Sequence, residues 1–435
     1  MRSPMTDRDS RLLLWQRVRE YAVPVSMIES ATARRRVGDW AGACSAARLD
    51  VDVNLRSAVR VYGREVAAAI RADLRHLAPE LLRWHMPRIA PDGLLRPGLT
   101  ISLVRYEPAD FDRPAGAVQL VVRTPPGWAD GGQRMSLALW DRSRVGSGAH
   151  RPPHPDRRFR MDLHRHLWDV RRAGELRARA GLSPHARGWA VDRWADEAAL
   201  LLSAEGLAAG RVAVQLGGGA RRLLDVGTGA GRGSASCQVL PDAATWSLPD
   251  QELLRAGLVT ADRLHPLVAA ALAPDGALPT DRTRPGALPR SNPHARLVDC
   301  RGARHRIGLA GGVLTPLDHD PAEIRREELL AALTGTPLPC LRAIDQAYRN
   351  PESLPDVRAR LDHGDVTGAL STVEALLGPG ALLRDGALRD EIEDAAHRRL
   401  AYGLFRSGLV GLGPYGLPRR SPAAARPHRG RTNSR

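Results

Sequence analysis

The spacing of apolar residues changes twice along this chain, and that change restricts the fold more than any other feature. From Leu55 to Leu77 apolar residues recur at every third or fourth position, as on one face of a helix. Three segments between residues 99 and 140 instead alternate apolar and polar residues, as strands with one buried face do. Helical spacing returns after residue 320. We therefore predict an α+β fold, with helical hairpins at the N- and C-terminal ends and an antiparallel β meander and hairpins in the middle.

Glycine- and proline-containing segments separate regions of different character in this 435-residue chain. Helices are expected at 162–181 and 190–205, and Asp320 followed by Pro321 predicts the start of another helix. We expect six regions: a helical region at 1–90, an antiparallel β meander at 91–145, an Arg-rich linker with helices at 146–210, a mixed α/β region with two β hairpins at 211–319, a helical region at 320–410, and a disordered basic tail at 411–435.

Arginine supplies all of the basic side chains other than histidine, because the sequence contains no lysine. This absence excludes P-loop nucleotide-binding proteins, Schiff-base enzymes and the usual lysine-dependent kinases. With 64 basic and 48 acidic residues, the formal net charge is +16. Arginine together with abundant alanine, glycine and proline is also typical of a GC-rich genome, so the total charge alone does not indicate a nucleic-acid partner.

The placement of the charge is more informative than its total. Residues 142–179 carry eleven arginines and four acids, and the tail from Pro418 carries six arginines and no acids. Arginine beside aromatic side chains suits phosphate contact and base stacking. One alternative function is therefore nucleic-acid or polyanion binding through the segment 142–179 and the C-terminal tail. The residues expected to bind are Arg157, Arg158, Arg160, Arg165, Arg171, Arg172 and Trp168.

The four cysteines are widely separated and have no CxxC spacing: Cys44, Cys237, Cys300 and Cys340. The N-terminus does not have the pattern of a secretory signal, and no segment reaches the roughly 18 consecutive apolar residues of a membrane span. We therefore expect reduced, mostly buried thiols in a cytoplasmic protein.

Histidine placement does not predict a metal site. His164 and His166 are two residues apart on an expected helix, which would direct them to opposite sides. Cys300, His305 and His319 lie around an expected hairpin at irregular spacing. We expect no metal and no resident cofactor.

Two segments far apart in the chain have similar sequences. Residues 33–47 align without gaps on residues 359–373, with seven of fifteen positions identical, and both place a Gly-Asp pair between two helical stretches. The pattern is similar to the helical hairpins of tetratricopeptide-type repeats, whose faces bind peptides, although the two copies are not in tandem. This pairing, together with the lack of a recognisable catalytic constellation, makes a non-enzymatic scaffold or adaptor that binds another protein the leading hypothesis.

The segment from Leu224 to Gly231 resembles the cofactor-binding motif of class I S-adenosylmethionine-dependent methyltransferases. There an acidic residue ends a strand and a glycine loop follows. The resemblance assigns cofactor binding to Asp225, Gly227, Gly229, Gly231 and, at the end of a second strand, Asp262. However, Asp225 and Asp262 are 37 positions apart, whereas about 20 are usual, and Gly217–Gly219 predicts an antiparallel hairpin. Methyl transfer is therefore the second alternative.

Overall fold

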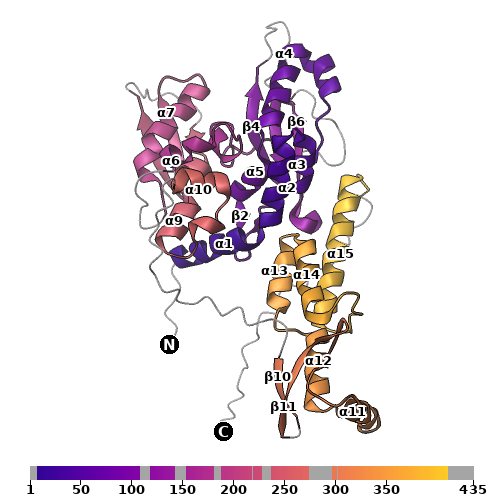
Figure 1. The fold of residues 1–435 in the computed structure, drawn as a ribbon. Coiled ribbons are helices and arrows are strands. Elements are labelled where there is room, and N and C mark those ends of the chain that lie inside the picture. The colour runs from indigo at the N-terminus through magenta and orange to yellow at the C-terminus, as the bar shows by residue number, and fades with distance from the viewer. Residues whose placement is uncertain are drawn as a thin grey trace, which may run out of the picture.

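The chain folds as the apolar spacing predicts, into an α+β protein with helical ends and small sheets between them (Figure 1). The structure, a computed structural model, describes residues 7–107, 118–142, 153–180, 188–217, 219–227, 237–273, 296–300 and 302–409. The expected tail at 411–435 lies outside these residues. Within them, no helix is both long enough and apolar enough to cross a membrane.

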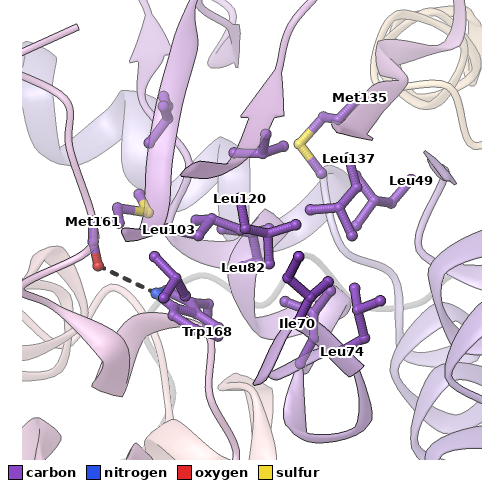
Figure 2. Close-up of a cluster of buried hydrophobic side chains, with 14 of the residues drawn as sticks. Leu49, Ile70, Leu74, Leu82, Leu103, Leu120, Met135, Leu137, Met161 and Trp168 are labelled. Carbon is purple, nitrogen blue, oxygen red and sulfur yellow. Dashed lines mark hydrogen bonds between the residues drawn. The ribbon is translucent and has the colours of Figure 1, made fainter. Parts of the chain in front are cut away.

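The expected meander forms the centre of the largest sheet. Strands β4 (Thr100–Tyr106), β5 (Val118–Arg123) and β6 (Met135–Trp140) pair antiparallel, and a short strand, β1 (Leu49–Val51), adds to β6 in parallel. Helix α4 (Leu55–His76) packs its apolar stripe on this sheet. Figure 2 shows Ile70 and Leu74 of the helix meeting Leu103, Leu120 and Leu137 of the sheet.

A second core joins the N-terminal helices to a segment more than 150 residues later. Buried Val18, Leu81 and Trp84 pack with Leu264 and Val268. The helices that meet there are α1 (Asp7–Tyr21), α2 (Val25–Arg36), α3 (Trp40–Ala46), α5 (Pro79–His85), α9 (Pro249–Arg255) and α10 (Pro266–Leu272).

A third small core lies under a three-stranded sheet. Strands β7 (Gly210–Gly217) and β8 (Ala220–Val226) form the expected hairpin, and β9 (Gln238–Val239) adds in parallel to β7. Helix α7 (Trp194–Ala204) covers this core, and the short helix α8 (Asp242–Thr245) packs beside α7.

The prediction of a helix at 162–181 is wrong for most of that segment. The chain there makes two 3-10 turns, Arg165–Leu167 and Ala173–Glu175, and one short helix, α6 (Leu176–Arg179). The Asp169 carboxylate accepts a hydrogen bond from the backbone N–H of Arg171, which competes with helical hydrogen bonding.

The C-terminal part combines a second meander with helices. Strands β10 (Arg296–Cys300), β11 (Ala303–Ala310) and β12 (Val313–Pro316) pair antiparallel, and the turn between the last two contains the expected Gly311-Gly312. Asp320 caps the following helix as predicted, accepting from the backbone N–H of Ala322 at 2.9 Å. The helices are α11 (Pro321–Thr334), α12 (Pro339–Arg349), α13 (Leu354–Asp362), α14 (Val366–Leu377) and α15 (Ala387–Arg406).

The two similar sequence segments adopt the same local structure. Asp39 caps α3 by accepting from Gly42 N at 2.8 Å, and Asp365 caps α14 by accepting from Gly368 N at 3.2 Å. The preceding residue is in each case a glycine with a φ near +80°, a backbone conformation that favours glycine. The prediction of two capped helical hairpins is therefore confirmed.

Candidate functional site

A partly enclosed cavity of about 200 Å³ lies between α1, the hairpin of β2 (Arg88–Ile89) and β3 (Leu94–Leu95), and two later segments, 159–180 and 242–249. Much of its wall is apolar and aromatic. The apolar side chains include Trp15, Phe159, Met161, Leu176, Trp246 and Leu248. A cavity of this kind at the junction of several elements is the usual setting of a small-molecule site.

Arginine side chains supply most of the polar wall. Four of the six lining arginines are compensated by buried carboxylates. Arg11 pairs with Glu252 at 2.5 Å, and Arg19 binds Asp250 through two hydrogen bonds of 2.7 and 2.8 Å. Arg179 and Arg193 share a third carboxylate, that of Glu197.

The other two lining arginines, Arg88 and Arg96, have no ion pair within the described part of the chain. Buried Arg88 donates to the carbonyl oxygens of Arg83 at 2.6 Å and Gly93 at 3.5 Å. The Arg96 guanidinium lies over the Phe159 ring, 5.3 Å from its centroid. The Nε atom of each is buried without a hydrogen-bond partner in the described residues. Burial lowers the pKa of Arg88 to about 9, so the group is still protonated at pH 7.

One carboxylate, that of Asp242, also lines the cavity and offsets part of this charge, because it interacts electrostatically with both Arg158 and Arg96. It accepts a hydrogen bond of 2.7 Å from Arg158, whose guanidinium lies on the face of Phe159. Burial raises the pKa of Asp242, and the guanidinium groups of Arg158 and Arg96 oppose that rise. Around the cavity, seven arginines therefore meet four carboxylates, and the excess is positive.

Histidine adds hydrogen-bond acceptors to the same wall. Nδ1 of His85 lies 3.1 Å from the carbonyl oxygens of both Leu81 and Leu167, and since carbonyls only accept, Nδ1 carries the proton. Burial lowers the pKa of His85 to about 4, so its Nε2 is an unprotonated acceptor at pH 7. That atom, like Nδ1 of His166, is buried without a hydrogen-bond partner among the described residues.

The residues predicted to bind a polyanion do not form one free basic surface. Within the described chain, exposed Arg157 has no ion pair, whereas Trp168 is fully buried and offers no face for base stacking. The other five predicted arginines pair with neighbouring carboxylates: Arg158 with Asp242, Arg160 with Asp162 and Glu205, Arg165 with Asp73, Arg171 with Asp169, and Arg172 with Glu175.

Among the described residues of the methyltransferase resemblance, the two acidic residues do not have the strand positions that the family requires. Asp225 lies on β8, antiparallel to β7, and its exposed carboxylate pairs with Arg211 at 2.9 Å. Asp262 lies in the 3-10 turn Ala261–Arg263, where the resemblance requires the end of a strand. Gly227 has a positive φ at the end of β8, and Gly229 and Gly231 lie outside the described residues.

Comparison of the chain with known protein families, with curated proteins and with solved structures found no match.

Proposed function

We propose that this protein binds a small organic anion in the arginine-lined cavity. The observation that carries the proposal is the pair of guanidinium groups, those of Arg88 and Arg96, that line the cavity without an ion pair in the described part of the chain, while the four other lining arginines pair with three carboxylates. A buried cation without a counter-charge is costly, and a bound anion removes that cost.

The rest of the wall defines the chemical class of the ligand. Guanidinium groups favour carboxylate or phosphate oxygens, which they bind through paired, charge-assisted hydrogen bonds. Trp15, Phe159 and Trp246 favour an apolar or aromatic body on the same ligand. The unprotonated Nε2 of His85 accepts from a hydroxyl or N–H group. A small aromatic acid or phosphate monoester combines these features.

Phenyl phosphate is a suitable probe of this site, with benzyl alcohol as its uncharged counterpart. We expect isothermal titration calorimetry to detect binding of phenyl phosphate and much weaker binding of the alcohol. Arg88→Met and Arg96→Gln are each expected to weaken phenyl phosphate binding by roughly 10- to 100-fold, because a hydrogen bond to a charged group contributes about 1.5–3 kcal/mol.

The matched control is Arg222→Gln, which removes an exposed arginine on β8 and leaves the cavity unchanged. Equal affinity of the three variants would show that phenyl phosphate binds only through overall positive charge, and the cavity proposal would then be abandoned.

A second candidate function, binding of a partner protein, is favoured by the surface of α11. Three of its leucines are exposed: Leu329 by 67%, Leu330 by 50% and Leu333 by 86%. This helix lies at the end of the C-terminal part that is far from α1 (Figure 1). Exposed apolar groups of this kind are typical of protein interaction sites.

Affinity purification after chemical crosslinking in the source cells, with and without nuclease, tests this second candidate. We expect a discrete protein that survives nuclease treatment and is lost from the Leu329→Glu/Leu333→Glu variant, while Arg222→Gln retains it. Loss of all partners upon nuclease treatment would instead favour the polyanion alternative.

A further inference from the structure

Three potential metal ligands meet at the junction of β10, α11 and α12, with a second cysteine near them, in a part of the molecule separate from the cavity. Cys300 ends β10, His319 precedes α11, Glu327 lies within α11, and Cys340 is in the first turn of α12. One ligand atom from each of Cys300, His319 and Glu327 lies within 4.8 Å of the other two. Cys340 belongs to the same buried cluster as Cys300 and acts electrostatically on both Cys300 and Glu327, which places a second sulfur near the group.

All four side chains are removed from solvent. Cys300 is 1% exposed and Cys340 is fully buried, and the side chains of His319 and Glu327 are each 4% exposed. Both carboxylate oxygens of Glu327 lack a hydrogen-bond partner among the described residues. A buried carboxylate beside two cysteines in an apolar core is costly unless something compensates its charge.

The histidine is held in an orientation that suits ligation through Nε2. Its Nε2 faces Oε1 of Glu327 at 3.5 Å, and its Nδ1 faces Oε2 of Glu323 at 3.6 Å. His305 stacks on the His319 ring with the centroids 4.3 Å apart, which restricts rotation of the ring. A carboxylate beside the non-ligating nitrogen is the usual outer partner of a metal-bound histidine.

We propose that Cys300, Cys340, His319 and Glu327 form a structural zinc site. Two sulfurs, one imidazole nitrogen and one carboxylate oxygen form a donor set that zinc accepts in tetrahedral geometry. Typical Zn–S and Zn–N distances place such ligand atoms roughly 3.3–3.8 Å apart, so small movements of Cys300, His319 and Glu327 bring these three side chains together, and a rotation of the Cys340 side chain completes the proposed set. Binding of Zn²⁺ releases the proton of each thiol to solvent, and the two thiolates and the carboxylate then offset the charge of the ion.

The role of the ion is structural, because all four coordination positions are filled by protein and the site is closed to solvent. It joins the end of β10 to α11 and to the first turn of α12. Glu327 is the one buried residue of α11 among those described, so a metal bound to Glu327 would fix α11 against the rest of the C-terminal part. A Cys300–Cys340 disulfide in the same position would leave the Glu327 carboxylate without compensation.

Metal analysis of the full-length protein tests the proposal directly. Protein produced in zinc-supplemented medium and passed through a desalting column is expected to retain about one zinc ion per chain. After removal of zinc with a chelator, addition of Co²⁺ is expected to produce a thiolate-to-cobalt charge-transfer band and the visible bands of a tetrahedral site. Cys300→Ser and Cys340→Ser are expected to remove most of the bound zinc, whereas Cys237→Ser, at an exposed cysteine outside the cluster, is expected to retain it.

Glu327→Gln keeps the shape of the side chain, and it provides a second test of the site in case the cysteine variants misfold. This variant is expected to fold and to keep both thiols. Its affinity for zinc, measured by competition with a coloured chelator, is expected to be at least tenfold lower than that of the wild-type protein. Three results would overturn the proposal: no thiolate band with Co²⁺, wild-type zinc content in the Cys300→Ser/Cys340→Ser double variant, or a Cys300–Cys340 disulfide in protein alkylated without reduction.

Discussion

Asp250→Ala is expected to lower the free energy of unfolding by about 3–5 kcal/mol, because it leaves a buried arginine without its counter-charge. Asp250 binds Arg19 through two hydrogen bonds, and the two side chains are 0% and 2% exposed. The indole of Trp84 donates to the same carboxylate at 3.2 Å, and the Arg19 guanidinium lies 4.3 Å from the Trp84 ring centroid. Urea denaturation followed by tryptophan fluorescence measures the loss.

An exposed ion pair provides the control. Asp225→Ala removes the partner of Arg211, and because both side chains are more than half exposed, we expect a change of at most about 1 kcal/mol. The double variant Arg19→Met/Asp250→Leu is expected to regain most of the stability lost by Asp250→Ala, since no unpaired charge stays buried. A loss below about 1 kcal/mol for Asp250→Ala would contradict the importance of this pair.

The parts of the fold that depend on short sequence segments could be predicted from the sequence. Alternation of apolar residues gave the meander of β4, β5 and β6, and the Gly-Asp pairs gave both capped hairpins. The Asp320 cap was likewise predicted from four consecutive residues. Each of these features is determined by backbone propensities and hydrogen bonds between residues close in the chain.

The cavity could not be predicted, because its charge depends on pairing between distant residues. Arg19 and Asp250 are 231 positions apart, and Arg11 and Glu252 are 241 apart. Sequence alone does not reveal which arginines have partners, so Arg88 and Arg96 looked no different from the other arginines. Counting the charge in 142–179 does not show this pairing either: acids of this segment and of other segments pair with most of the predicted binding residues.

The proposed zinc site was missed because its spacing is set by tertiary structure. The sequence analysis considered Cys300, His305 and His319 as metal ligands. It did not predict a site there, because their spacing is irregular. The structure adds Glu327 and Cys340 from two helices, and places His305 beside His319 as a stacking partner. A search for clustered cysteines and histidines does not find a set that includes one glutamate and spans forty residues.

Trp168→Ala is expected to lower the free energy of unfolding by about 3–5 kcal/mol, the range typical of a large side chain removed from a core. Trp168 is fully buried against the core of α4 and the largest sheet (Figure 2). Its indole donates to the Met161 carbonyl at 3.2 Å, and its backbone carbonyl accepts from Ala78 N at 2.8 Å. The side chain and the backbone carbonyl of Trp168 therefore together hold the irregular segment 161–169 against the N-terminal helices.

Two further variants separate this packing role from the surface role that the sequence suggested. Trp168→Phe keeps most of the volume and loses one hydrogen bond, so a smaller loss of about 1–2 kcal/mol is expected. Arg157→Ala changes an exposed residue of the same predicted set, and its effect is expected to stay within about 0.5 kcal/mol. If Trp168→Ala unfolded in urea at the same concentration as Arg157→Ala, the indole would have to lie at the surface, and base stacking on it would again be possible.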